Sequence, residues 1–276
     1  MNQIKLYKKI ILYTILGVGA FFYMLPFLWM IRTSLMEYAQ SQDPNIWIPN
    51  PVVWGNFPKA LSYMNFWVLL KNTLMITSLC MIGQMLSSTM VAFGFSRMKF
   101  PGRDFLFMLV LSTMMLPGMV TEIPRFIFFR HLGWVDTILP LTVPAFFGGG
   151  AFFIFLLRQF FLTIPFDLDD AARIDGCSSW RIYWNIMLPL SKPVMATVVI
   201  FSFIWSWNDF WGPLIYLRSA DKKTLALGLQ AFQGISQTDY HYLMAASLVV
   251  LLPVLIIYVV AQKYFTQGIV MSGMKG

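Results

Sequence analysis

Charged residues are scarce in this sequence. Only 12% of its 276 residues are Asp, Glu, Lys or Arg, whereas 58% are hydrophobic and the mean hydropathy is +0.67. Soluble domains carry about a quarter charged residues, so the composition excludes a soluble globular protein. Runs of about 20 apolar residues, enough to cross a bilayer core, recur along the whole chain. The sequence therefore predicts an all-α polytopic membrane protein without a separate soluble domain.

Cysteine, histidine and catalytic motifs are also rare. Cys80 and Cys177 lie far apart without metal-ligand spacing, and the two histidines, His131 and His241, fall in predicted outer segments. No GxSxG, HExxH or GxxxxGK[ST] motif occurs. We therefore expect no catalytic residue, no metal site and no cofactor bound by this chain itself.

The apolar runs and the basic residues between them predict a topology. Six spans place both termini on one side, and most of the 20 Lys and Arg residues fall in segments on that side. The positive-inside rule then predicts cytoplasmic termini. The net charge of +8 reflects this topology, because the basic residues form no separate face that would bind nucleic acid. The predicted spans are residues 10–31, 68–95, 105–124, 138–157, 194–217 and 243–265.

Breaks are expected within two of these spans. Pro117 and Pro124 in the third span each remove a backbone donor, which neighbouring groups must compensate in lipid. The fourth span holds Pro140 and Pro144, followed by glycines at 148–150. Such interruptions are tolerated in helices that line a cavity, which indicates a transport path. Ordinary close packing of helices at glycine explains them equally well.

The predicted cytoplasmic loop 158–193 contains the acidic stretch DLDDAARIDGCSSW. Pro165 favours a helix start, and the aspartates that follow complement the positive amino end of a helix. Gly176 can leave the helix with φ > 0, so a short helix should end at Asp175. The stretch therefore predicts an acid-edged helix of two to three turns.

The faces of this loop suggest docking of a soluble partner. Leu168, Ala171 and Ala172 share one helix face by their spacing, and small alanines allow another surface to approach closely. A second helix, capped by Ser178 or Ser179, should lie in the membrane interface until Pro189 ends it. Capping alone would also explain the aspartates. The apolar face of the second helix would consist of Trp180, Tyr183, Trp184 and Met187.

This loop resembles a motif of a known family. The stretch DDAARIDGCSSWRIYWNIMLPLSKP is similar to the EAA loop of the membrane subunits of ABC importers. In that loop an acidic residue and two alanines precede a glycine, and an isoleucine, a leucine and a proline follow. Aspartate stands here where glutamate is usual, and Cys177 stands where alanine is common. The resemblance implies coupling to an ATPase through Asp170, Ala171, Ala172, Asp175, Gly176, Ile186, Leu188 and Pro189.

The resemblance covers nearly the whole chain. The stretches VAFGFSRMKFPGRD, WNDFWGPLIYL and QKYFTQGIVMSGMKG look like those of the maltose-type carbohydrate permeases. This implies a type I ABC importer permease fold with six transmembrane helices, in which a five-helix core follows an added N-terminal helix. Residues 1–276 would form one permease domain, with the N-terminal span and outer loop in 1–67 and the core in 68–276.

The resemblance also implies partners and a location. The chain would lie in a bacterial-type plasma (inner) membrane and pair with a second permease subunit. Two ATPase subunits would hold ATP and Mg²⁺, and an extracytoplasmic solute-binding protein would deliver a carbohydrate substrate. The missing GxxxxGK[ST] motif agrees with ATP hydrolysis on another chain, so the coupling would be mechanical.

Polar residues in the fifth predicted span are candidates for the substrate pathway. Trp205, Asn208, Asp209 and Gly212 share one helical stripe with Ser202. A charge there costs about 2.5–3.5 kcal/mol, so the stripe should face the bundle interior or a wet cavity. A sugar needs the polar partners and flat apolar surface that this stripe offers. Asn208 and Asp209 would equally well bridge helices or line an outer gate.

An ion-coupled secondary transporter is the alternative function. Asp209 and Glu122 would then carry protons within the broken spans. Such a transporter would not explain the acid-edged docking loop, and the sequence shows no internal repeat. We otherwise expect Glu122 to lie beside Arg125 at the outer surface.

Overall fold

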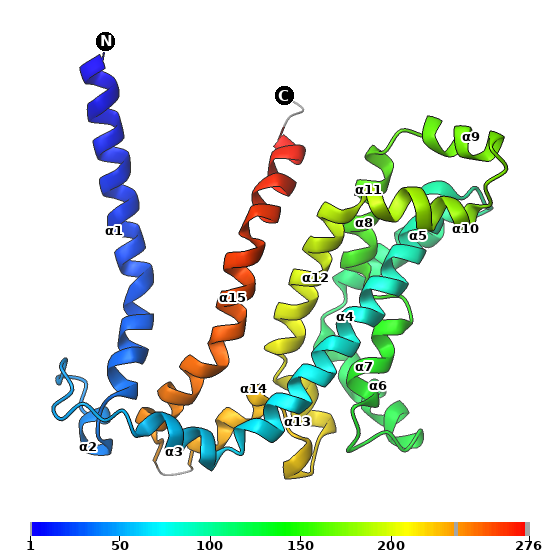
Figure 1. The fold of residues 1–276 in the computed structure, drawn as a ribbon. Coiled ribbons are helices and arrows are strands. Elements are labelled where there is room, and N and C mark those ends of the chain that lie inside the picture. Colours follow the sequence, from blue (N-terminus) through cyan, green and yellow to red (C-terminus); the bar gives the residue numbers. More distant parts are fainter. Residues whose placement is uncertain (1, 235–236, 274–276) are drawn as a thin grey trace. The chain divides into compact units, whose positions relative to one another are not determined.

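The computed structural model describes residues 2–234 and 237–273, and the side chains of residues 6–234 and 237–260. Every named element in this part of the chain is a helix, and its only strand-type pairing is an isolated bridge between Gln233 and Thr238. The prediction of an all-α protein is therefore confirmed. The helices form two compact units, Met1–Phe66 with Gly228–Leu252 and Trp67–Leu227 with Pro253–Gly276 (Figure 1).

Unit 1 holds the first long helix and the start of the last one. Asn56 is buried at the start of α3, and its side-chain amide donates to the carbonyls of Ser34 at 2.9 Å and Met36 at 2.7 Å. These bonds fix α3 against the end of α1. The described helices of this unit are α1 (Asn2–Ser34), α2 (Tyr38–Ser41), α3 (Asn56–Tyr63), η5 (Leu229–Phe232) and the first part of α15 (Tyr240–Gly273).

Unit 2 is built around one apolar core. Buried side chains from α4, α8 and α12 meet there with side chains from the loop helices α9 to η3. The helices of this unit, in chain order, are α4 (Phe66–Arg97), α5 (Arg103–Ser112), η1 (Thr113–Met115), α6 (Gly118–His131), α7 (Leu139–Thr142), η2 (Val143–Phe146), α8 (Ala151–Thr163), α9 (Asp167–Ile174), α10 (Ser179–Ile182), η3 (Tyr183–Met187), α11 (Leu188–Leu190), α12 (Lys192–Trp207), α13 (Trp211–Tyr216), η4 (Ala220–Lys222) and α14 (Leu225–Gly228).

The described helices agree with six membrane spans. Four of them are long and apolar enough to cross a membrane, and two bent pairs raise the number to six if each pair is one span. The third predicted span bends by 100° between Met115 and Gly118, next to Pro117. The helical run that contains the fifth span bends by 79° between Leu190 and Lys192. The predicted fifth span also ends early, because α12 stops at Trp207 instead of continuing to residue 217.

The glycines of the fourth span mark a close approach of two helices. Gly148, Gly149 and Gly150 all have positive φ angles and separate η2 from α8. A Cβ on Gly149 would fall within 2.8 Å of Ser87 and Ser88 on α4. Close packing therefore explains Gly149, as the second of the two expectations for this segment proposed.

A cluster of polar contacts around Asp136 ties the loop before α7 to the loop after α13. Asp136 has a φ of 62°, and its carboxylate accepts bonds from the amides of Arg218 and Ser219, both at 2.9 Å. The Ser219 hydroxyl donates to the same carboxylate at 2.6 Å, and Lys222 Nζ lies 3.0 Å away. These donors, the Ser219 hydroxyl first, hold the pKa of Asp136 well below its ordinary value.

We expect Asp136→Asn to lower the melting temperature of the purified protein at pH 7. A carboxylate with a depressed pKa stabilises the fold above its unfolded pKa of about 3.9, and this contribution is lost as the pH falls through the folded pKa. The difference between wild type and variant should therefore shrink below about pH 4. Melting curves from pH 7 to pH 3 measure this, with Asp221→Asn as the control. Equal melting temperatures at pH 7 would contradict it.

Candidate functional site

The predicted acid-edged helix is present as α9. It runs over Asp167–Ile174, and Gly176 follows with a φ of 78°. The amide of Gly176 donates to the Arg173 carbonyl at 3.0 Å and that of Cys177 to the Ala172 carbonyl at 2.9 Å, which is a Schellman motif. The helix start, its end and the left-handed glycine thus agree with the sequence-based prediction.

The faces of α9 differ from the prediction. Ala172 is 7% exposed and packs into the unit 2 core, whereas Ala171 is exposed. The predicted shared face of Leu168, Ala171 and Ala172 is therefore split, because α9 needs one side to pack against its own chain. The exposed apolar face instead consists of Leu168, Ala171 and Ile174, and Ile174 is 87% exposed. We call these three residues the α9 face.

An ion pair fixes the inner side of α9. Asp169 is buried, and its carboxylate lies 3.4 Å from the guanidinium of Arg97 at the end of α4. Burial raises the pKa of Asp169 above its ordinary value, while the charge of Arg97 opposes that rise. The three other aspartates of this stretch, Asp167, Asp170 and Asp175, are exposed around the α9 face.

The second loop helix follows the predicted cap and ends next to Pro189. The Ser178 hydroxyl accepts from the amide of Arg181 at 3.3 Å. A π-turn, η3, comes next, and the helix ends at Leu190, one residue after Pro189, so the expected end is confirmed to within one residue. Pro189 has no amide hydrogen, and a π-turn shifts the hydrogen-bond partners by one residue, which accommodates it.

The apolar side chains of this second helix divide between core and surface. Tyr183 and Met187 are buried in the unit 2 core, and the Tyr183 hydroxyl lies 2.7 Å from Thr89 Oγ1 on α4. Trp180 and Trp184 are 56% and 48% exposed. Only the tryptophans are thus free for the membrane interface. Ile186 and Leu188 of the EAA-like stretch also pack against the core, and Pro189 is exposed.

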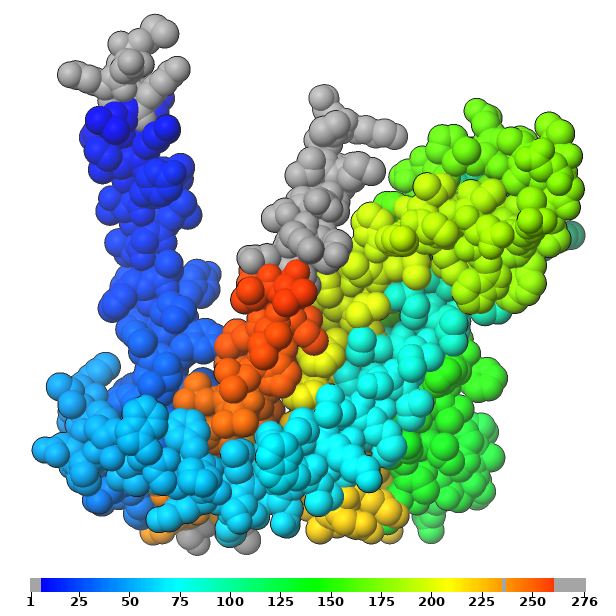
Figure 2. All heavy atoms as spheres, in the orientation of Figure 1, coloured from blue at the N-terminus to red at the C-terminus, as the bar shows by residue number. Residues whose placement is uncertain are grey.

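Figure 1 shows α9 at one end of unit 2, beyond α10 and α11. In Figure 2 the atoms of these loop helices form a lobe at the same end. Ala172, Ile182 and Tyr183 attach this lobe to the unit 2 core by packing into it. The α9 face, by contrast, is not covered by any other described part of the chain.

The predicted substrate stripe is interrupted. Because α12 ends at Trp207, Asn208 and Asp209 lie in the break before α13, and the prediction of one continuous stripe was wrong. The Asn208 side-chain amide donates to the Ile204 carbonyl at 2.8 Å. Asp209 accepts from the Gly212 amide at 3.1 Å. Each side chain thus satisfies a backbone group at a helix end.

The other candidate residues near this break have defined neighbours. Trp205 is 49% exposed, and its ring lies 5.0 Å from that of Phe153. A Cβ on Gly212 would collide with the Asp209 carboxylate and with Leu141. Glu122 lies 3.2 Å from Arg125, as predicted. Both carboxylates of the ion-coupled alternative therefore have partners within the chain.

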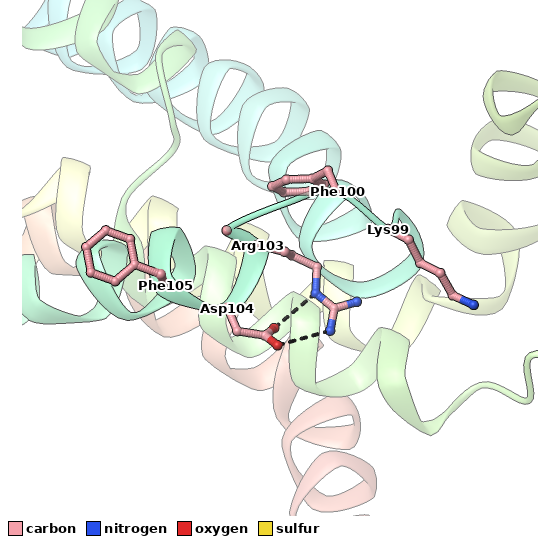
Figure 3. Close-up of a pocket in the computed structure, with 6 residues that line it drawn as sticks. Lys99, Phe100, Arg103, Asp104 and Phe105 are labelled. Atoms are coloured by element: carbon pink, nitrogen blue, oxygen red, sulfur yellow. Dashed lines mark hydrogen bonds and ion pairs between the residues drawn. The ribbon is translucent and has the colours of Figure 1, made fainter.

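A surface hollow of about 460 Å³ lies on the turn between α4 and α5. Figure 3 shows the Arg103 and Asp104 side chains paired there, with Lys99 and Phe105 pointing to opposite sides of the turn. Its lining residues include none of the candidate pathway residues Trp205, Asn208, Asp209 and Gly212, so it gives no support to that pathway. No group of three potential metal ligands occurs among the described residues.

Broken apolar spans, a rooted helical loop and an all-helical core define a polytopic membrane permease. The chain belongs to the family of inner membrane components of binding-protein-dependent transport systems, whose sequence model matches residues 84–270. The members of this family are membrane components of transport systems, so this chain is a transport subunit and not an enzyme.

Curated relatives and solved structures resemble the chain over most of its length. A putative ABC transporter permease protein, ORF2, from Caldicellulosiruptor sp. (strain Rt8B.4) is 36% identical over 91% of both chains. The arabinooligosaccharides transport system permease protein AraQ of Halalkalibacterium halodurans is 33% identical over 93% of both. A bacterial ABC transporter that imports the acidic polysaccharide alginate has the same fold, with a TM-score of 0.82, 24% identity, and coverage of 94% of this chain and 96% of that one. The type I importer permease fold is therefore confirmed.

Proposed function

We propose that the chain is the permease subunit of an ATP-driven importer that moves a sugar or oligosaccharide delivered by an extracytoplasmic solute-binding protein. Membership of a binding-protein-dependent family supports the delivery step. The arabinooligosaccharide permease and the alginate importer support a carbohydrate substrate. The chain would pair with a second, different permease subunit, and two ATPase subunits would hold ATP and Mg²⁺.

The α9 face carries this proposal. Ile174 is 87% exposed although fully burying such a side chain is worth about 1.5–3 kcal/mol. Ala171 beside it adds little bulk, and three exposed aspartates surround the face. An exposed apolar face with a charged rim is typical of a protein interaction site. The ATPase is the proposed partner, and its closing motion would push on α9.

The proposal includes a topology and a domain assignment. The loop 158–193 and both termini would lie in the cytoplasm of a bacterial-type cell, and the basic turn between α4 and α5 would lie on the same side. Residues 1–276 would act as one permease domain, in which 1–67 contribute an N-terminal span and outer loop and 68–276 the core. Coupling contacts would come from the EAA-like residues that are exposed, Asp170, Ala171, Asp175, Gly176 and Pro189.

Trp205, Asn208, Asp209 and Gly212 are proposed to border the substrate pathway. The half-exposed ring of Trp205 offers an apolar platform, and the break after α12 offers polar groups beside it. We expect Trp205→Ala to raise the KM for uptake by about three- to tenfold with little change in kcat, because a flat contact is lost. Uptake kinetics with Trp205→Phe, which keeps a flat ring, provide the control. An unchanged KM in the alanine variant would remove Trp205 from the pathway.

Photo-crosslinking tests the docking contact directly. A photoreactive amino acid in place of Ile174 should crosslink to the ATPase subunit in the assembled complex. The same group in place of Ile123 on α6, which is 72% exposed, is the matched control and should not do so. Equal crosslinking from both positions, or none from position 174, would contradict docking through the α9 face.

A further inference from the structure

Arg97 is an arginine that the apolar interior of unit 2 almost completely encloses. It is the last residue of α4, and its side chain is 1% exposed. Removing a charged group from water is costly unless close partners compensate it, so the position of this side chain requires an explanation. The neighbouring Arg103 differs, since its side chain is 30% exposed and pairs with Asp104, which is 71% exposed.

The Arg97 guanidinium contacts both sides of the short connection from α8 to α9. On the α8 side, its Nη2 donates to the carbonyls of Phe161 in α8 at 2.6 Å and of Ile164, the first residue of the connection, at 2.7 Å. After the connection, Nη1 lies 3.4 Å from Asp169 of α9. Between them the ring of Phe166 lies 4.3 Å from the guanidinium carbon. One planar side chain thus joins the ends of α4 and α8 to the start of α9.

These contacts bear on how a force on α9 would be transmitted. The connection of α8 to α9 spans only residues 164–166, and such a segment can hinge when nothing crosses it. Arg97 crosses it from a third element, α4. The part of the loop that follows α9 is also tied to α4, through a hydrogen bond between the hydroxyls of Tyr183 in η3 and Thr89. Farther towards the start of α4, the Gln84 side chain accepts a hydrogen bond from the Ser202 hydroxyl of α12.

We propose that Arg97 is a positioning residue that makes α9 move as one body with α4 and α8, so that docking forces reach the spans. This inference rests on the proposed function, because it assumes that α9 receives the motion of an ATPase. Without the guanidinium, α9 would still present its face and bind the ATPase. The motion would then bend the connection at 164–166 instead of moving the spans, and hydrolysis would be uncoupled from transport.

Arg97→Lys is the sharpest variant for this proposal. Lysine keeps the positive charge, but a single ammonium group lacks the planar fork that holds two carbonyls and a carboxylate together. Arg103→Lys is the matched control, because it makes the same chemical change at a partly exposed arginine a few residues away. Asp169→Asn removes only the charge on the α9 side and keeps the two carbonyl contacts, so it serves if Arg97→Lys fails to assemble.

The complex of both permeases, the ATPase subunits and the binding protein should be reconstituted in liposomes with each variant. For Arg97→Lys we expect normal ATPase binding and basal hydrolysis, whereas substrate uptake per ATP falls by about three- to thirtyfold. Amide hydrogen exchange should accelerate at residues 164–176 and stay unchanged along α4. Asp169→Asn should show the same pattern to a smaller extent, and Arg103→Lys should match wild type.

Wild-type uptake per ATP in an assembled Arg97→Lys complex, or in Asp169→Asn if the first variant does not assemble, would overturn the proposal. A loss of uptake per ATP equal to that in Arg103→Lys would overturn it as well. These results differ from a failure of the proposed function itself. In that case the wild-type complex would show no ATP-dependent uptake, whatever residue 97 is.

Discussion

Gly176→Val should abolish ATPase binding or substrate-stimulated hydrolysis while leaving insertion in the membrane intact. Gly176 has a φ of 78°, a region that costs an L-residue about 1–2 kcal/mol and a β-branched one more. Nothing lies within 4 Å of an added Cβ, so the substitution acts through backbone conformation and not through a clash. The chain can relieve the strain only by leaving the Schellman motif, which would turn the end of α9 and displace Ile174.

Gly102→Val separates this effect from strain in general. Gly102 has a nearly identical φ of 76° and also has nothing within 4 Å of an added Cβ, but it lies on the turn between α4 and α5. We expect the Gly102 variant to bind the ATPase and to hydrolyse ATP like wild type. Membrane fractionation, co-purification and hydrolysis assays measure the three properties. Normal stimulated hydrolysis by the Gly176 variant would refute the docking role of α9.

Gly212→Val should destabilise the break after α12 and strongly reduce uptake. Its Cβ would collide with the Asp209 carboxylate and with Leu141 of α7. If Asp209 turned away, the Gly212 amide at the start of α13 would lose its acceptor. Overpacking of this kind costs about 1–3 kcal/mol, and the lost hydrogen bond adds to it.

Denaturant unfolding of the purified protein and uptake by the reconstituted complex measure this effect. Gly118→Val is the matched control, because an added Cβ at Gly118 has nothing within 4 Å and Gly118 also begins a helix after a break. We expect the control to unfold at the same denaturant concentration as wild type. A Gly212 variant that does so too would show that the turn held by Asp209 adapts freely.

The loop helix α9 could be predicted because its signals are local. Pro165, the aspartates of the first turn and Gly176 act within a few residues of the helix ends that they define. Its buried side could not be predicted in the same way. In the sequence, nothing distinguishes Asp169 from the solvated aspartates beside it, because its partner Arg97 lies at the end of a different helix. Spacing within α9 does not reveal which side an arginine from elsewhere will occupy.

The break after Trp207 shows the limit of apolar runs as a signal. The stretch from Ser202 to Trp207 is mainly apolar and aromatic, with two serines, and it contains no proline or glycine that would end the helix. The side chains of Asn208 and Asp209 nevertheless compete for backbone groups and end the helix. A carboxylate inside a membrane span is energetically costly, and a break of the helix just before Asp209 is consistent with that cost. By contrast, Pro117 correctly indicated the bend of the third span.

Uptake into liposomes that contain the complete complex tests the central claim most directly. Labelled oligosaccharide and its binding protein are supplied outside, and the lumen contains either ATP with Mg²⁺ or a non-hydrolysable analogue. We predict uptake that requires hydrolysable ATP, continues when a protonophore removes any proton gradient, and is lost with Gly176→Val. Uptake driven by an imposed proton gradient without ATP would contradict an ATP-driven importer coupled through α9.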